Sequence, residues 1–137
     1  MISLSNVPLK PLTKGQLWIS HYPGKIGMED KIIQAEIDLL ELKKKNIDTV
    51  VSLLEKKELK PLNVSTLFEL IKKHKFTHYY FPIKDKSVPK KNVELNRLLN
   101  DLSFKIRQNK KILLHCNAGL GRSGLIAALL CKKLGIS

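Results

Sequence analysis

An apolar run that enters a glycine-rich turn constrains the fold of this chain more than any other segment. The run reads Lys111-Ile-Leu-Leu-His-Cys116, the turn reads Asn-Ala-Gly-Leu-Gly, and an apolar segment beginning Arg122-Ser-Gly-Leu-Ile follows. A short apolar run bounded by turn residues is typical of a buried strand, and the longer segment is typical of a helix. The sequence therefore predicts a strand over 111–115, a tight loop, and a helix over 123–134.

The loop carries residue types that suit an anion-binding cradle. N–H groups at a helix start lack intrahelical partners and carry partial positive charge, and a tight loop can turn several of them toward one anion. Gly119 and Gly121 are expected to allow positive φ and close approach of the anion. Arg122 can hold two phosphate oxygens with its planar fork. We expect the following residues to surround a phosphate: His115, Asn117, Ala118, Gly119, Leu120, Gly121 and Arg122.

Cys116 lies at the mouth of this expected cradle. The positive field favours a thiolate, so we expect the pKa of Cys116 to lie below the value of about 8.5 for a free cysteine. Ser123 is placed where its hydroxyl could stabilise the sulfur as a leaving group, and His115 is expected to orient the loop through hydrogen bonds. The alternative interpretation is a structural cysteine beside an incidental arginine, because motif matches carry a false-positive risk.

The stretch resembles the signature of the cysteine-dependent protein phosphatases, His-Cys-x5-Arg-Ser/Thr, and its defining positions match. From Gln16 to Leu130 the chain resembles, more narrowly, the kinase-associated phosphatase branch of the dual-specificity phosphatases, notably in Leu17-Trp-Ile-Ser-His-Tyr-Pro23-Gly24 and in the Gly-Leu-Gly-Arg-Ser core of the loop. The resemblance implies the phosphatase fold and hydrolysis of phosphotyrosine and/or phosphoserine/threonine in phosphorylated proteins. It also implies a cysteinyl-phosphate intermediate and no cofactor.

Such a reaction needs an acid that protonates the leaving oxygen. The run Thr77-His-Tyr-Tyr-Phe-Pro-Ile83 reads as a strand, and Asp85 is the carboxylate of the Pro/Lys/Ser loop that follows. Asp85 matches the loop aspartate that the resembling phosphatases carry upstream of the cysteine, which implies a general acid and then a general base. The alternative is a solvated charge on a surface loop. Glu58 is expected to support Arg122 from a neighbouring loop.

Strands and helices alternate along the chain. Strands are predicted over 17–20, 47–54 and 77–83, and helices over 30–45, over 91–108, and from Asn63 or Ser65 to about His74. This order predicts an α/β fold with a mostly parallel central sheet flanked by helices, with 47–54 as a central strand. The Cys116 and Asp85 loops then follow the carboxyl ends of strands, where such sheets bind ligands. The following apolar residues are predicted to face the interior: Trp18, Ile33, Ile37, Leu40, Phe81, Val93 and Phe104.

Length and composition limit the organisation of the chain. We expect 137 residues to form a single phosphatase domain over 1–137. Because the resembling phosphatases continue past the position of Ser137, the chain is expected to be either truncated at its C-terminus or a compact variant. Two cysteines fit a reducing compartment, and no apolar run is long enough for a membrane span. The expected location is therefore cytoplasmic, and Cys131 is expected to pack in the core.

The net charge of +13 should attract phosphorylated or acidic partners. Sites that read nucleic acids favour arginine forks and stacked aromatics, and neither clusters here, so nucleic acid is a less favoured partner. His21, His74 and His78 show no metal-ligand spacing, and no metal is expected.

Two alternative functions remain open. The same site could act on an RNA 5′-triphosphate or a phosphoinositide, although the loop residues Asn117, Ala118 and Leu120 carry no charge to match a polyanion. The chain could also be a phosphate-binding module without turnover.

Overall fold

The computed structural model describes residues 2–9, 13–85, 87, 89, 92–118 and 121–136. Its centre is a five-stranded sheet made of β1 (Leu4–Val7), β2 (Gln16–His21), β3 (Thr49–Ser52), β4 (Thr77–Tyr80) and β5 (Lys111–Cys116), in the order β1-β2-β5-β3-β4. β2, β5, β3 and β4 are parallel, and β1 pairs antiparallel with β2. The predicted α/β class with a mostly parallel sheet is confirmed. β1 is an additional edge strand that the sequence patterns do not predict.

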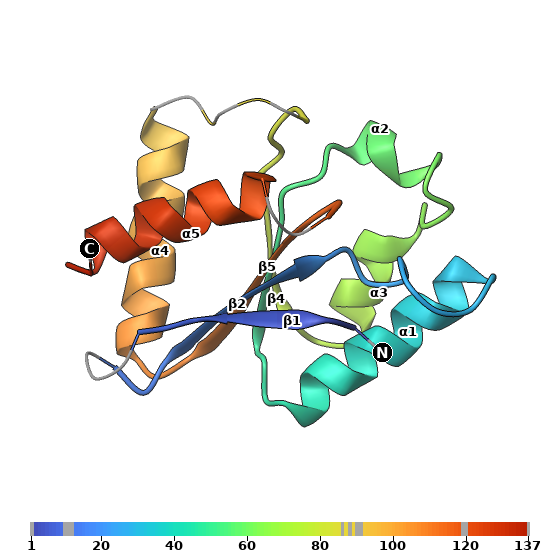
Figure 1. The fold of residues 1–137 in the computed structure, drawn as a ribbon, viewed down its shortest axis with the longest axis horizontal. Coiled ribbons are helices and arrows are strands. Elements are labelled where there is room, and N and C mark those ends of the chain that lie inside the picture. The colour runs from blue at the N-terminus through green and yellow to red at the C-terminus, as the bar shows by residue number, and fades with distance from the viewer. Residues whose placement is uncertain are drawn as a thin grey trace.

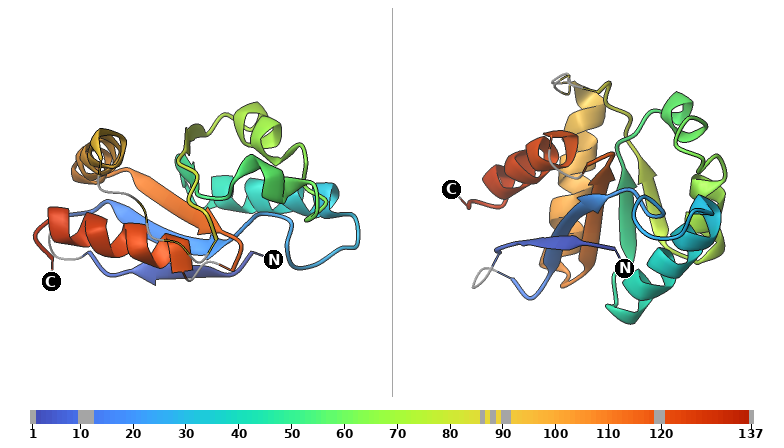
Figure 2. Two further views of the ribbon diagram at one scale, coloured as in Figure 1. Left: turned by 90° about the horizontal axis from the view of Figure 1, so that it is seen from above. Right: turned by 45° about the vertical axis from the view of Figure 1, so that its right-hand side comes forward.

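Helices cover both faces of this sheet. α4 (Val93–Arg107) and α5 (Gly121–Lys133) lie on one face, and α1 (Lys31–Lys44) and α3 (Leu67–Lys73) lie on the other (Figure 1). The further views in Figure 2 keep the two helix pairs on opposite sides. The short α2 (Lys56–Leu59) follows β3. None of the helices in the described ranges has the length and hydrophobicity that a membrane crossing requires.

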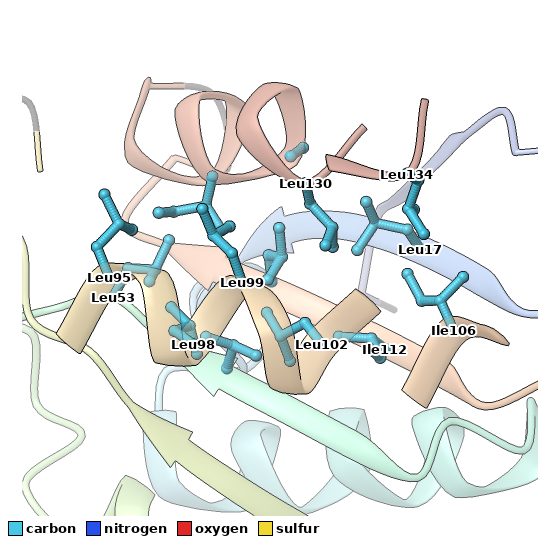
Figure 3. Packing of buried hydrophobic residues seen from close by; sticks show 14 of the residues in the cluster. Leu17, Leu53, Leu95, Leu98, Leu99, Leu102, Ile106, Ile112, Leu130 and Leu134 are labelled. Atoms are coloured by element: carbon cyan, nitrogen blue, oxygen red, sulfur yellow. The ribbon is translucent and has the colours of Figure 1, made fainter. Parts of the chain in front are cut away.

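Two hydrophobic clusters hold the helices on the sheet. Side chains alternate between the faces of a strand, so Ile112 and Leu114 of β5 enter the cluster under α4 and α5, while Leu113 enters the cluster under α1 and α3. Figure 3 shows the first cluster, in which Leu99 and Leu102 of α4 pack with sheet residues. β3 and β5 are therefore covered on both faces, as parallel strands usually are.

The predicted helix over 30–45 is confirmed as α1. Asp30 caps it by accepting hydrogen bonds from the N–H groups of Ile32 and Ile33, both at 3.1 Å. The predicted inward face is partly wrong: Ile33, Ile37 and Leu40 are 46, 45 and 50% exposed. The buried side of α1 instead includes the polar Gln34 and Asp38, which hydrogen-bond the preceding loop.

Other helix boundaries differ from the predictions. α3 begins at Leu67 with Thr66 as its N-cap, because Asn63 adopts a φ of 61° in the turn after α2. α4 begins at Val93, where the Asn92 side chain accepts from the Leu95 N–H at 2.9 Å. The predicted start at Lys91 lies outside the described residues.

The sheet and the predicted core also need corrections. β3 covers 49–52 rather than 47–54, but its predicted central position is confirmed, because it lies between β5 and β4. β4 ends at Tyr80, and α5 begins at Gly121, two residues before the predicted start. Predicted interior residues that are exposed or only partly buried in the structure are Val93 (71% exposed), Phe104 (65% exposed), Trp18 and Phe81.

Candidate active site

Four loops meet at one edge of the sheet, because β2, β3, β4 and β5 are parallel and end there. In Figure 1 this edge lies in the upper half of the view, near the start of α5 and α2. A cavity of about 470 Å³ lies at this edge. Its lining residues are Lys25, Asp85, Ser87, Cys116, Asn117, Ala118, Gly121, Arg122 and Leu125. The loop that carries Cys116 and the loop that carries Asp85 therefore form walls of one cavity.

Cys116 is the last residue of β5 and lies opposite His21 of β2. Only 3% of the residue is exposed, and it contributes to the cavity lining. Cys131, the other cysteine, does not line the cavity and is half-buried against the core under α4 and α5. A thiol at the end of the middle strand is held in place by the sheet on both sides.

Arg122, the second residue of α5, is fixed by three hydrogen bonds. Its two terminal nitrogens donate to the two carboxylate oxygens of Glu58 at 2.7 and 3.0 Å, and one also donates to the Ile83 carbonyl at 2.9 Å. The residue is only 4% exposed. The expected support from Glu58 is confirmed. Such a two-pronged pair fixes the orientation of a guanidinium plane more firmly than a single contact.

Glu58 and burial act in opposite directions on Arg122. Burial would lower the pKa of Arg122, but the hydrogen bonds and negative charge of Glu58, together with Cys116 and Asp85, raise it. Glu58 is itself held at the start of α2, where its carboxylate also accepts from the Glu55 N–H at 2.7 Å. The cavity thus contains a guanidinium that stays charged and oriented.

Asp85 lies on the loop between β4 and α4. One of its carboxylate oxygens is 3.7 Å from an Arg122 terminal nitrogen, beyond hydrogen-bond length, and its side chain is 66% exposed. The root of the loop is fixed, because the Ile83 N–H donates to Leu53 at 3.0 Å and the Ile83 carbonyl accepts from Arg122. The structure therefore places a solvent-exposed carboxylate in the lining of the cavity, on a loop that hydrogen bonds hold at Ile83.

A chain of hydrogen bonds crosses three strands beneath the cavity. The Ser52 hydroxyl of β3 lies 2.6 Å from Nε2 of His115 on β5 and 2.8 Å from Nε2 of His78 on β4. Burial, followed by the neighbouring His78, lowers the pKa of His115 to about 3, and burial with Lys72 lowers the pKa of His78 to about 4. Both rings are neutral at pH 7. Because a hydroxyl has one proton, Ser52 donates to one ring and accepts from the other.

His115 lies away from the surface of the cavity. It is fully buried and is not among the residues that line the cavity, whereas the sequence predicted it around a bound phosphate. Its hydrogen bond to Ser52 instead orients the residue immediately before Cys116. This agrees with the separate expectation that His115 orients the loop.

The remaining predicted site residues divide into three groups. Asn117, Ala118 and Gly121 line the cavity, whereas Gly119 and Leu120 lie outside the described residues. The expected positive φ at Gly121 is wrong, because Gly121 is the first residue of α5 and an added Cβ would meet nothing within 4 Å in the described part of the chain. Ser123 is fully buried, and among the described residues its hydroxyl has no hydrogen-bond partner.

Three lining residues, Lys25, Ser87 and Leu125, were missed by the sequence reasoning. Lys25, on the loop between β2 and α1, donates from Nζ to the carbonyl and side-chain oxygens of Asn117 at 3.3 and 3.0 Å. Ser87 lies on the Asp85 loop. In a lysine-rich sequence nothing marks Lys25 except its place after the Pro23-Gly24 turn. The described residues contain no group of three or more His, Cys, Asp or Glu side chains that could hold a metal ion.

Comparison with known families agrees with this geometry. The model of the family described as "Polymorphic toxin system, DSP-PTPase phosphatase" (Tc-R-P) matches residues 26–134. The chain belongs to this DSP-PTPase family. The matched segment contains Asp85, Cys116 and Arg122, which line the cavity, and Glu58, which pairs with Arg122.

The sequence of this DSP-PTPase chain is similar to those of proteins named cyclin-dependent kinase inhibitor 3. It is 30% identical to cyclin-dependent kinase inhibitor 3 of Rattus norvegicus over 137 residues, which cover 99% of this chain and 64% of the rat protein. The chain thus spans less than two thirds of that relative.

Solved structures show the same similarity. The crystal structure of kinase associated phosphatase with its catalytic site cysteine replaced by serine matches with a TM-score of 0.85 and 26% identity, covering 97% of this chain and 74% of that one. Tk-PTP in its active form matches with a TM-score of 0.67 and 29% identity, covering 94% of this chain and 78% of that one.

Proposed function

We propose that this chain hydrolyses phosphate monoesters on phosphorylated proteins, at phosphotyrosine and/or phosphoserine/threonine, through a cysteinyl-phosphate on Cys116. The observation that carries the proposal is the meeting of a buried cysteine, a fixed guanidinium and a solvent-exposed carboxylate at one cavity. Membership of the DSP-PTPase family and the similarity to kinase associated phosphatase support it. In this proposal residues 1–137 act as one phosphatase domain.

In the first step the Cys116 sulfur attacks phosphorus, and the bond between phosphorus and the ester oxygen breaks. Arg122 and the N–H groups at the start of α5 stabilise the equatorial oxygens, because both present positive charge to the cavity. Asp85 transfers its proton to the departing oxygen. The products of this step are the dephosphorylated side chain and a phosphoryl group on sulfur.

In the second step water attacks the phosphoryl group. The Asp85 carboxylate accepts a proton from this water, the bond between phosphorus and sulfur breaks, and inorganic phosphate leaves. Ser123 is proposed to donate a hydrogen bond to the departing sulfur, a role that its buried hydroxyl beside Arg122 would allow. His115 acts indirectly, by holding the start of the loop through Ser52.

The lining of the cavity favours a phosphoprotein over polyanionic substrates. Arg122 is already paired with Glu58, and Asn117 and Ala118 are uncharged, so in the described lining only Lys25 is left to match the further charges of an RNA 5′-triphosphate or a phosphoinositide. A reducing, cytoplasmic location is proposed with the reaction, because the Cys116 sulfur has to stay reduced to attack phosphorus.

Phosphate release in the presence of EDTA tests the proposal. Wild type should release phosphate from p-nitrophenyl phosphate and from phosphopeptides, and Cys116→Ser should reduce release to the background rate. Cys131→Ser is the matched control, because Cys131 does not line the cavity, and it should retain the wild-type rate. Full activity of Cys116→Ser, or tight phosphopeptide binding by wild type without phosphate release, would contradict the proposal. Faster release from triphosphorylated RNA or inositol lipids would reassign the substrate.

A further inference from the structure

Lys25 is a cation of the cavity whose charge is not neutralised within the described part of the chain. Arg122, the other cation of the lining, is paired with Glu58 and lies near Asp85. No described carboxylate forms an ion pair with Lys25. The two cations therefore differ: one is part of an internal ion pair, and the other presents an unmatched charge to the cavity.

The fold holds Lys25 in place through buried polar groups of α1. Asp38, fully buried, accepts from the Gly24 N–H at 2.8 Å and from the Gln34 side chain at 2.8 Å. Gln34 in turn accepts from the Met28 N–H at 3.1 Å. Gly24 has a φ of 101°, and a Cβ there would lie 2.6 Å from the Lys31 carbonyl oxygen. The loop on both sides of Lys25 is thus fixed against the helix before any ligand binds.

The Lys25 ammonium group has donor capacity to spare. It carries three N–H donors, and the contacts to Asn117 engage the carbonyl and side-chain oxygens of that residue. Both acceptors are neutral, so they orient the ammonium group without cancelling its charge. The side chain is half-buried, which strengthens its interaction with an anion relative to a fully solvated lysine.

We propose that Lys25 binds a carboxylate of an acidic residue that flanks the phosphorylated residue in a peptide substrate. The inference rests on the proposed phosphatase function and names a specificity residue for it. A single carboxylate matches the one ammonium group of the described lining that lacks an ion pair. Among the described lining residues the other charged groups are Arg122, already paired, and Asp85, an acid, so they offer a polyphosphate few further positive charges.

Matched phosphopeptides test this inference. One peptide carries aspartate on each side of the phosphorylated residue, and the other carries asparagine at the same two positions. The phosphorylated residue in both peptides is phosphotyrosine or phosphothreonine, whichever the wild-type protein hydrolyses faster. Wild type should prefer the aspartate peptide in kcat/KM by roughly three- to tenfold, the size expected for one partly solvated charge pair. The preference should fall as salt is raised.

Three variants separate charge recognition from other roles of Lys25. Lys25→Gln should bring the preference to about one, and Lys25→Arg should keep most of it, because the charge is retained. Lys44→Gln is the matched control: it removes the same charge from an exposed position in the last turn of α1, away from the cavity lining. It should keep the wild-type preference.

Several results would overturn the inference. If Lys25→Gln lowers kcat/KM for both peptides by the same factor and the preference for aspartate remains, the role of Lys25 is only to hold Asn117. No aspartate preference in wild type, or a Lys25-dependent preference for triphosphorylated RNA or inositol phosphates over both peptides, would also overturn it. Release of phosphate from p-nitrophenyl phosphate, which has no second anion, reports on the proposed function separately. If wild type hydrolyses none of these substrates, the proposed function fails and this inference fails with it.

Discussion

Two carboxylates face Arg122 from neighbouring loops, and their surroundings differ sharply. Glu58 makes two hydrogen bonds of 2.7 and 3.0 Å to the guanidinium, and its side chain is 18% exposed. Asp85 approaches only to 3.7 Å, and its side chain is 66% exposed. The α2 turn thus holds its carboxylate in a fixed ion pair, whereas the loop after β4 leaves its carboxylate in contact with water.

This difference separates two tasks that one cavity has to perform. Stabilising a phosphoryl group needs a cation whose position does not change, and a buried two-pronged ion pair provides it. Moving protons needs a carboxylate that can approach the reacting oxygens, which a residue held against an arginine by two hydrogen bonds does poorly. Glu58 suits the first task and Asp85 suits the second.

Replacing the shared partner of both carboxylates should have the largest effect. Arg122→Lys keeps a positive charge but cannot bridge both oxygens of Glu58 or hold two phosphate oxygens. We expect kcat/KM to fall about 100- to 1,000-fold on p-nitrophenyl phosphate and phosphopeptides alike. Steady-state assays on both substrates measure this fall in kcat/KM. A loss below about tenfold would mean that a single positive charge is sufficient at this position.

Replacing Asp85 should have an effect that depends on the leaving group. Asp85→Asn removes the proton donor, so hydrolysis of a phosphopeptide should slow about 100-fold, while p-nitrophenyl phosphate, whose leaving group needs no proton, should slow far less. Steady-state rates on a series of aryl phosphates of increasing leaving-group pKa measure the trend. An equal loss on every member of the series would rule out Asp85 as the acid.

The same change of carboxylate to amide at Glu58 should give the opposite pattern. Glu58→Gln leaves the Arg122 charge partly uncompensated, so we expect a uniform loss of about tenfold across leaving groups and a free energy of unfolding lower by about 1–3 kcal/mol. Chemical denaturation and the same aryl phosphate series measure the two effects. A leaving-group dependence like that of Asp85→Asn would remove the distinction between the two carboxylates.

The last prediction concerns stability alone and the histidines beneath the cavity. Burial lowers the pKa of His115 to about 3 and that of His78 to about 4, below the usual 6.5. Between pH 6.5 and 4 the unfolded chain therefore binds protons that the folded chain does not, and the free energy of unfolding falls as the pH falls. Each histidine should contribute about 1.4 kcal/mol per pH unit well below 6.5.

Urea denaturation of wild type and His78→Gln at pH values between 7 and 4.5 measures this slope. The variant should lose part of the pH dependence, because only His115 then remains neutral in the folded state. Equal slopes in the two proteins would show that His78 does not resist protonation.

The strands near the site were predictable because their patterns are local. The run that ends at Cys116 and the run that starts at Thr77 are both apolar or β-branched and bounded by turn residues, and both are strands. The alternation of strands and helices then predicted the parallel sheet, and that topology brings the Cys116 and Asp85 loops to one edge.

What sequence reasoning missed depends on contacts between distant residues. Asp38 reads as a surface position of α1, yet it is buried because it accepts from the Gly24 N–H. Lys25 meets Asn117 across 92 residues of chain. His115 was expected at the substrate, but its position in the middle strand buries it beside Ser52. No periodicity or motif encodes these pairings.

The most direct test of the account is detection of a phosphoryl group on Cys116 during turnover. The Asp85→Asn variant with p-nitrophenyl phosphate suits the experiment, because the first step needs no acid with this substrate while the second step loses its base. Rapid quenching followed by mass spectrometry should find one phosphoryl group on the peptide that contains Cys116. A phosphoryl group on another residue, or turnover in the Cys116→Ser variant, would contradict the account.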